Sequence, residues 1–322
     1  MRSIEGLRGT AIVTRAGQVT LEVASGLADA EAGAMCTPRT RFQISSISKQ
    51  FAAVAALLLA ESGALDLAEP VARWLPGGPP QWQRVTLHHL LTHTAGVRHW
   101  DNAPGFDASK PMDPAERVAL IQQAPLLTEP GTRWQYSSPG YVLAGHVVAQ
   151  SSGRPYAEFL TEQVLAPLGL TETSVGGVTV AARGYRDGQP VTSWPVATMP
   201  GTGDICATVG DLARFEAAVH SGSLISRSSL QAMITPHAAV PDDQGTSDGW
   251  VTCDGYGYGQ YILRIGGHAA YGHTGDNPGY RSLAAWLPGP AACVAFLSNE
   301  ETADTEALLR QLVPAALDGD AP

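Results

Sequence analysis

The sequence predicts an α/β (α+β) protein in which strands from both ends of the chain surround a helical middle. Strand-like segments occupy residues 10–26 and return beyond residue 250, whereas helical segments separated by Pro/Gly loops fill the stretch between them. A sheet built from both ends of a chain leaves the intervening chain as an insertion. We therefore expect one α/β domain made of residues 1–65 together with 216–322, and a helical domain of residues 66–215.

Local signals support each of these elements. Residues 10–26 have the pattern of two short strands joined by the turn Arg15-Ala16-Gly17-Gln18. Residues 46–62 begin with serines, continue as QFAAVAALLLAES and stop at Gly63, which predicts a strong helix. The later segments, in chain order, are helices at 113–124, 140–153, 156–169 and 208–222, strands at 256–267, 269–275, 279–288 and 292–299, and a last helix at 302–317.

Composition limits the classes of function. The chain has 20 basic and 30 acidic residues among 322, and this formal charge of −10 argues against a nucleic-acid partner. Hydrophobic residues make up 44% and charged residues 16%, as in a folded globular protein. The cysteines are far apart and form no CxxC pair, so neither a zinc site nor a disulfide framework is expected; they are Cys36, Cys206, Cys253 and Cys293.

The longest apolar run bears on location. It covers residues 51–60, too few to cross a bilayer, and the residues before the first strand hold no apolar run of signal-peptide length. We expect a cytoplasmic protein that acts on a small molecule without a membrane partner, or an exported one if the recorded start is incomplete. The sequence does not predict the oligomeric state.

A candidate catalytic pair lies at the start of the helix over 46–62. Ser46 and Lys49 are three residues apart, which places both side chains on one helix face. Free N–H groups at a helix start favour a developing alkoxide, and burial lowers the pKa of a lysine, so Lys49 can act as a base toward Ser46. The alternative is a simple serine N-cap, because S-x-x-K occurs about once by chance in a chain of this size. Lys49 is one of two lysines in the chain, which favours a specific role.

Further motifs follow this pair in order. FQISSISKQF precedes LLTHTAGV, PGTRWQYSSPGYVLAGHVV, VLAPLGLTET and YGHTGDNPGYRS. Together they resemble the serine β-lactamase-like family, which includes class C β-lactamases, DD-peptidases, D-amino-acid amidases, carboxylesterases and some acyltransferases. The resemblance runs from about residue 10 to 317. It implies a β-lactamase/DD-peptidase-like fold, with an antiparallel sheet flanked by helices, an inserted all-helical domain, and an active site at their interface.

The resemblance also implies catalytic roles. Ser46 is the acyl-accepting nucleophile, Lys49 accepts its proton, and Tyr136 shares proton transfer and protonates the leaving group. His273 begins the third motif of the family, here His-Thr-Gly. Taken alone, Tyr136 fits a core aromatic and His273 a satisfied strand histidine, but the ordered context favours a catalytic role for both. No metal or organic cofactor is implied.

The expected substrate-binding residues complete the site. Thr274 and Gly275 continue the third motif, and the backbone N–H groups of Ser46 and Asp276 form the oxyanion hole. Ser138 stands where β-lactamases and DD-peptidases of the family have asparagine, and a serine hydroxyl is too short both to bind an acylamido group and to hold the lysine. Asp276 is a second departure, an acid beside the oxyanion site that either points away or meets a cationic substrate group.

Three other patterns have better structural explanations. Ser247 lies in a G-x-S-x-G pattern, but a polar loop surrounds it instead of the strand and helix that a nucleophile elbow requires. His89 and His93 have the spacing of metal ligands on a helix, yet structural histidines are the better explanation. The alternation of Gly255, Gly257 and Gly259 with tyrosines fits a strand edge better than a phosphate loop.

The sequence therefore predicts a serine hydrolase that forms an acyl-enzyme at Ser46. Hydrolysis of a small carboxylic ester is the first hypothesis, because Ser138 replaces the asparagine. An acyltransferase of secondary metabolism, and a β-lactamase, DD-peptidase or D-amino-acid amidase, are the alternatives. A binding or sensor module that retained the fold is the hypothesis from a different class.

Overall fold

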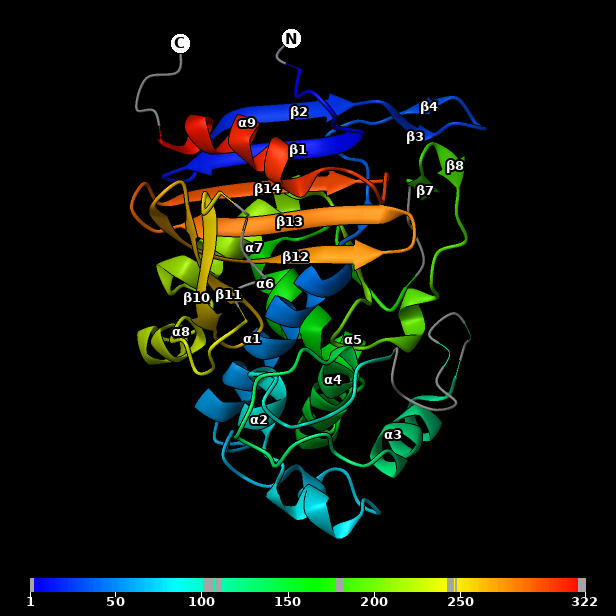
Figure 1. The fold of residues 1–322 in the computed structure, drawn as a ribbon, viewed down its shortest axis with the longest axis vertical. Coiled ribbons are helices and arrows are strands. Elements are labelled where there is room, and N and C mark those ends of the chain that lie inside the picture. Colours follow the sequence, from blue (N-terminus) through cyan, green and yellow to red (C-terminus); the bar gives the residue numbers. More distant parts are fainter. Residues whose placement is uncertain are drawn as a thin grey trace.

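A seven-stranded antiparallel sheet forms the upper part of the molecule in Figure 1. The computed structural model describes residues 3–100, 107, 110, 112–177, 182–241, 246 and 248–317. The strand order β10-β11-β12-β13-β14-β1-β2 joins the N-terminal hairpin to the C-terminal strands, which confirms the predicted α+β fold. The bounds are Gly9–Arg15 (β1), Gln18–Ser25 (β2), Val251–Tyr256 (β10), Tyr261–Ile265 (β11), His268–Asn277 (β12), Tyr280–Leu287 (β13) and Ala292–Ser298 (β14).

Both faces of this sheet are buried. Along β14, Val294 and Phe296 pack with helix α9 (Thr305–Leu317), whereas Ala295 and Leu297 belong to the core on the other side. Helix α7 (Val209–Ser221) covers that second face, and Figure 1 shows α9 in front of the sheet and α7 behind it. Successive side chains of a strand point to opposite faces, so the nearly continuous apolar sequence of β14 is what a doubly covered strand requires.

Helix α1 (Ser48–Glu61) links the sheet to the helical part. Its residues from Ser48 to Leu57 are all buried, and it packs against α4 (Ser138–Ser152). The remaining helices are α2 (Leu87–Leu91), α3 (Pro114–Gln123), α5 (Tyr156–Leu160), α6 (Ala166–Leu168) and α8 (Arg227–Met233), with 3-10 turns η1 (Ser45–Ile47), η2 (Val71–Arg73), η3 (Pro80–Arg84) and η6 (Val196–Thr198) and a π-helical turn η5 (Thr161–Leu165). The short strands are β3 (Leu27–Asp29), β4 (Ala34–Met35), β5 (Phe42–Gln43), β6 (Ser174–Val175), β7 (Tyr185–Arg186), β8 (Gln189–Pro190) and β9 (Ile205–Ala207).

Several predicted elements differ in detail. The strand predicted over 256–267 is the hairpin of β10 and β11, because Gly259, with a φ of +72°, turns the chain between them. The helix predicted over 156–169 is divided into α5, η5 and α6. Helix α7 crosses the domain boundary expected at residue 215 and packs on the sheet, so the chain returns to the sheet before residue 216.

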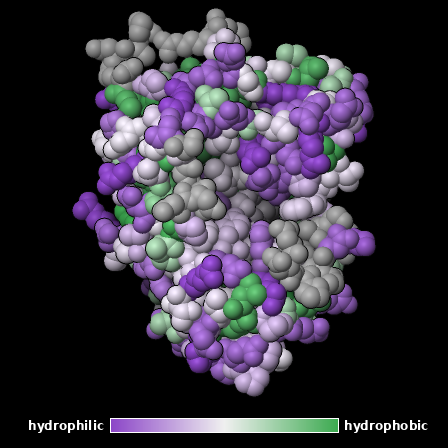
Figure 2. All heavy atoms as spheres, viewed as in Figure 1, coloured by the Kyte–Doolittle hydropathy of each residue, from purple (hydrophilic) through white to green (hydrophobic). Residues whose placement is uncertain are grey.

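The surface and the thiols agree with a folded globular protein. Figure 2 shows a face covered mainly by hydrophilic residues, with hydrophobic ones in small separate groups. In the described part of the chain, no helix has both the length and the apolar character needed to cross a membrane. All four cysteines are free.

Two stacked phenylalanines connect α1 with α7, the helix behind the sheet. The rings of Phe51 and Phe215 are buried, with centroids 3.7 Å apart and planes 9° from parallel. We expect Phe215→Ala to lower the free energy of unfolding by about 3–5 kcal/mol, because it removes a buried ring and leaves a cavity. Urea denaturation followed by circular dichroism measures this. Val19→Ala, at an exposed position of β2, should change stability by less than about 0.5 kcal/mol, and an equally small cost at Phe215 would contradict the prediction.

Candidate active site

Ser46 lies in the tight turn η1 immediately before α1. The preceding residue, Ser45, is buried and has a φ of +52°, which is uncommon for a residue other than glycine. This conformation changes the chain direction between β5 and η1, and Ser46 lines a cavity of about 600 Å³. Its N–H belongs to the first turn, where backbone donors lack partners within the helix.

Lys49 is one turn further along and is fully buried. Its Nζ atom lies 2.9 Å from Ser46 Oγ, 3.3 Å from Ser138 Oγ and 3.4 Å from the carbonyl oxygen of Thr202. Burial holds the pKa of Lys49 well below its usual range, against an opposing effect of Asp204. A lysine that is neutral near physiological pH can accept a proton from a neighbouring hydroxyl.

Tyr136 reaches the same hydroxyl from the segment before α4. Its phenol donates a hydrogen bond of 2.9 Å to Ser46 Oγ, and burial raises its pKa, so the phenol keeps its proton. The ring of His93 packs against Tyr136 at 4.4 Å, and His93 Nδ1 accepts the N–H of Ser137 at 3.1 Å. The Ser137 side chain in turn caps α4 through the N–H of Gly140. The cap therefore fixes both Tyr136 and the adjacent Ser138.

Strand β12 packs closely against η1. A Cβ atom on Gly275 would overlap the Ser282 hydroxyl and the Ile44 carbonyl oxygen, so glycine is required for this approach. The Ser282 hydroxyl donates a 2.9 Å hydrogen bond to that Ile44 carbonyl and joins the sheet to the turn. The following residue, Asp276, lines the same cavity as Ser46, which places both expected oxyanion residues at one site.

His273 takes a different position from the other three expected catalytic residues. Its Nε2 atom lies 3.1 Å from the Tyr256 hydroxyl and its Nδ1 atom 2.5 Å from the carbonyl oxygen of Thr274. Both ring nitrogens thus have partners other than Ser46. Burial lowers the pKa of His273 to about 3, so the imidazole is neutral. The ring borders the cavity, and its contacts fit a residue that holds Tyr256 and β12 in place.

The cavity above Ser46 has a volume of about 600 Å³. The aromatic and apolar residues of its lining form what we call the aromatic wall, and they are Trp100, Trp134, Trp194, Met199 and Tyr261. The charged residues of the lining form what we call the charged rim, and they are Arg186, Asp276 and Glu301. A cavity of this size holds a small organic molecule, and its apolar wall suits a hydrophobic group beside the reacting bond.

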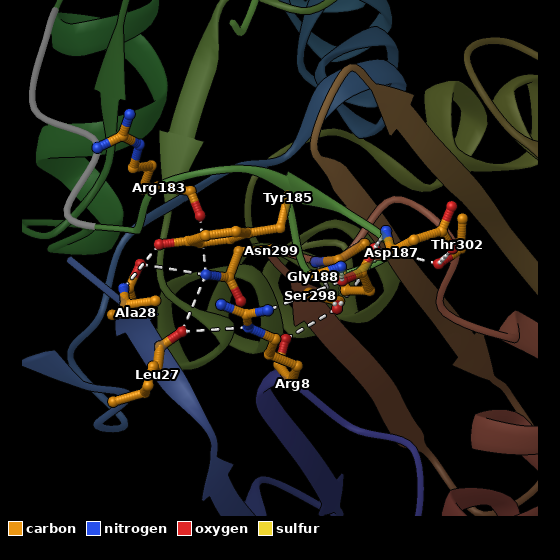
Figure 3. Close-up of polar contacts among 12 residues, drawn as sticks. Arg8, Leu27, Ala28, Arg183, Tyr185, Asp187, Gly188, Ser298, Asn299 and Thr302 are labelled. Carbon is orange, nitrogen blue, oxygen red and sulfur yellow. Dashed lines mark hydrogen bonds and ion pairs between the residues drawn. The ribbon is translucent and has the colours of Figure 1, made fainter. Parts of the chain in front are cut away.

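A dense polar network surrounds Asn299, which is close in the chain to Glu301 of the charged rim (Figure 3). The buried Asn299 amide donates to the carbonyl oxygens of Leu27, Ala28 and Arg183 at 2.8–3.1 Å, and Arg8 lies 3.8 Å from the centre of the Tyr185 ring. These contacts attach the hairpin of β7 and β8 to the end of β14, where Asn299 follows the strand.

Two ion pairs at this rim balance each other. Arg186 of the hairpin pairs with Glu301 at 2.8 Å, and Asp276 pairs with Arg281 at 2.8 Å directly across the β12–β13 ladder. Asp276 therefore does not stand alone as a negative charge. Its pKa is raised, because burial and nearby Glu301 outweigh the effect of Arg281.

The structure gives local roles to the other patterns. The His89 Nδ1 atom accepts the N–H of Thr86 at 3.2 Å and completes the capping box of α2, whereas His93 packs beside Tyr136. Gly255 lies in the edge strand β10, and Gly259 approaches the Lys49 carbonyl so closely that a side chain does not fit. Ser247 lies outside the described residues.

Sequence reasoning missed several residues of the site. Tyr256 was visible only as part of a Gly-Tyr alternation, and Thr202 and Asp204 belong to a glycine-rich turn without a recognised motif. Asp204 is buried, and burial raises its pKa to about 7. An acidic residue inside an otherwise apolar stretch of loop was the one available signal.

Comparisons with known proteins identify the family and the fold. The family model described as Beta-lactamase matches residues 3–317. A penicillin-binding protein from Bacillus halodurans is 27% identical, with a TM-score of 0.81 over 95% of this chain and 94% of that one. D-amino acid amidase from Ochrobactrum anthropi SV3, solved with L-phenylalanine, is 26% identical with a TM-score of 0.82 over 97% and 93%. Esterase EstB from Burkholderia gladioli is 37% identical over 199 residues, which are 56% of this chain and 50% of the esterase.

The contact between β12 and η1 yields a prediction. Gly275→Ala should reduce turnover of an activated ester by about tenfold or more, because the methyl group forces η1 and its Ser46 away from the strand. Steady-state kinetics and the melting temperature are measured on the same preparation. Gly210→Ala, at the start of α7 with open space around it, is the control and should retain activity. A fully active Gly275→Ala variant would contradict the assigned contact.

Proposed function

The chain belongs to the Beta-lactamase family as a serine hydrolase of that fold, and we propose that it is a carboxylesterase that forms an acyl-enzyme on Ser46. One observation carries the proposal. The Ser46 hydroxyl lies 2.9 Å from both Lys49 Nζ and Tyr136 OH, in a cavity large enough for an ester with a hydrophobic group. A nucleophile with a neutral amine on one side and a protonated phenol on the other is equipped for both halves of acyl transfer.

The first half reaction forms the acyl-enzyme. Ser46 Oγ attacks the ester carbonyl carbon while its proton passes to Lys49 Nζ, and the negative charge moves to the carbonyl oxygen. Backbone N–H groups of Ser46 and Asp276 are suited to stabilise that oxygen. The carbon–oxygen bond to the alcohol then breaks, and the alcohol leaves with a proton delivered through the Tyr136 phenol. Lys49 replaces the proton of Tyr136, so the pair ends the step neutral.

The second half reaction releases the acid. Water attacks the acyl carbon and gives a proton to the same Lys49 and Tyr136 pair. The ester bond to Ser46 then breaks, the pair returns that proton to Ser46 Oγ, and the free acid leaves. His273 has a supporting part in this scheme, because its neutral ring holds Tyr256 and the Thr274 carbonyl. Thr274 borders the cavity beside the reacting bond.

Ser138 favours an ester over a β-lactam or peptide. Its hydroxyl is 3.3 Å from Lys49 Nζ, so it holds the lysine and leaves no amide group for an acylamido side chain. Simple esters have no acylamido side chain, so the serine in place of asparagine does not weaken their binding. The likeness to esterase EstB supports this choice, and the likeness to D-amino acid amidase over nearly the whole chain makes a D-amino-acid amide the second candidate substrate.

Covalent labelling tests the nucleophile and its base. We expect a fluorophosphonate to add one adduct to the protein, detected by intact mass and mapped to Ser46, and Ser46→Ala to remain unlabelled. Lys49→Arg should lose at least about a hundredfold of the ester turnover at neutral pH, because arginine keeps its proton. Lys110→Arg, at the other lysine of the chain, is the matched control and should retain activity. Equal labelling of the wild type and Ser46→Ala would leave the binding or sensor module as the better explanation.

Substrate preference tests the role of Ser138. The wild type should hydrolyse p-nitrophenyl butyrate with a higher kcat/KM than nitrocefin or D-phenylalanine amide, and Ser138→Asn should shift the ratio toward nitrocefin by about tenfold. Ser152→Asn, at the far end of α4, should leave the ratio unchanged. A wild-type preference for nitrocefin would refute the esterase assignment, and a preference for the amide would favour the second candidate.

A further inference from the structure

Asp204 is a buried acid that the proposed reaction does not use. It is 2% exposed and lies just before β9, and it lines a second cavity of about 370 Å³ together with His146 and Tyr156. An ionised carboxyl inside a protein is costly unless it has hydrogen bonds or an opposite charge. The burial of this acid therefore requires an explanation.

The carboxyl group organises the turn that contacts Lys49. One of its oxygens accepts the N–H of Gly201 at 3.1 Å. Gly201 has a φ of +75°, and a Cβ atom there would lie 2.7 Å from the Tyr141 carbonyl oxygen, so the turn is pressed against α4. The next residue, Thr202, then presents its carbonyl oxygen 3.4 Å from Lys49 Nζ. Asp204 thus fixes one of three oxygens around the amine.

Asp204 also supplies negative charge near Lys49. The other groups that face the amine are aromatic or neutral: the rings of Tyr136 at 4.8 Å and Tyr141 at 5.6 Å, and the buried imidazoles of His93 and His273. Asp204 raises the pKa of Lys49 against the stronger effect of burial, and Lys49 in turn opposes the raised pKa of Asp204. The charge states of the two groups are therefore coupled.

We propose that Asp204 is the positioning residue of Lys49: it holds the Thr202 carbonyl against the amine and stabilises the ammonium that forms when Lys49 takes the Ser46 proton. The turn takes over part of the task of the asparagine that Ser138 replaces. The catalytic part of this inference rests on the proposed function, whereas the coupling of the two charges does not.

Removal of the Asp204 charge has two opposite effects on the reaction: more Lys49 is neutral at a given pH, but the chemical step is slower. Asp204→Asn keeps an oxygen that accepts the Gly201 N–H but removes the negative charge. The charged form of Lys49 is then less stable relative to the neutral form, so the pKa of Lys49 falls. The ammonium formed during the reaction loses its partner at the same time, which slows the chemical step. A purely structural residue would lower stability without moving the pH at which Lys49 titrates.

Carbon NMR measures the coupling without any substrate. The chain has two lysines, so lysine labelled with ¹³C at Cε gives two signals, and Lys110→Arg assigns them. We expect the Lys49 midpoint to move to lower pH in Asp204→Asn. The control is Asp211→Asn, another fully buried aspartate, which accepts the Glu172 N–H and the Thr173 hydroxyl and should leave that midpoint unchanged. The wild type alone should show a second inflection of the Lys49 signal as Asp204 titrates.

Kinetics test the catalytic part. The acidic limb of kcat/KM for p-nitrophenyl butyrate should move to lower pH in Asp204→Asn while kcat on the plateau falls by about tenfold. Asp204→Ala should lose more of the plateau kcat, because the turn also loses its hydrogen bond to the Gly201 N–H. The melting temperature of Asp204→Asn should be higher than that of Asp204→Ala. An unchanged Lys49 midpoint, or a wild-type signal without the second inflection, overturns the inference. A wild type without esterase activity but with the shifted midpoint overturns the proposed function alone.

Discussion

Burial of the Lys49 amine is the constraint on which the site depends. In water this side chain carries a proton and is no base, so the fold must remove solvent from it before Ser46 can be activated. Helix α1 meets this requirement because its apolar residues are buried, pack against α4, and include Phe51, which stacks on Phe215 of α7. The three oxygens around Nζ then direct the amine without giving it a full counter-charge in contact. An ion pair in direct contact with the amine would raise the pKa of Lys49 again and so cancel the effect of burial.

A second constraint is the approach of the sheet to η1. Ser45 adopts a left-handed conformation, and Gly275 admits the turn against β12, so two separate segments cooperate to place Ser46 beside Asp276. Both features depend on backbone geometry and would be lost through small steric changes. The same packing connects α1 to the centre of the sheet, which makes the site and the core parts of one structure.

The sequence predicted the strands and the long helices, and it singled out Ser46, Lys49 and Tyr136, which lie together in the structure, because all of these carry local signals. Apolar runs with glycine stops mark the elements, and the S-x-x-K spacing with a later Tyr136 marks the nucleophile. What it missed depends on contacts between distant segments. The contact of Thr202 with Lys49 is set by a turn more than 150 residues away in the chain, and the partners of His273 follow from the register of β12 with its neighbours. The hairpin between β10 and β11 was missed because the strand predicted over 256–267 runs through Gly259, where the chain turns.

Chemistry and recognition use different parts of this cavity. The groups proposed to move protons belong to η1, to α1 and to the segment before α4, whereas the other lining residues come from loops, from β7 and from the strands β11 and β12. The charges at the rim are paired, Arg186 with Glu301 and Arg281 with Asp276. Because each pair has no net charge, we expect the rim to select substrates by shape more than by charge. Under the proposed function, discrimination would then depend mainly on the aromatic wall, which includes Trp134 and Trp194. One fold can act on esters, amides and lactams when the acyl-transfer residues stay the same and the other residues of the cavity lining vary. In this chain the aromatic wall favours a substrate with a hydrophobic group next to the bond that reacts.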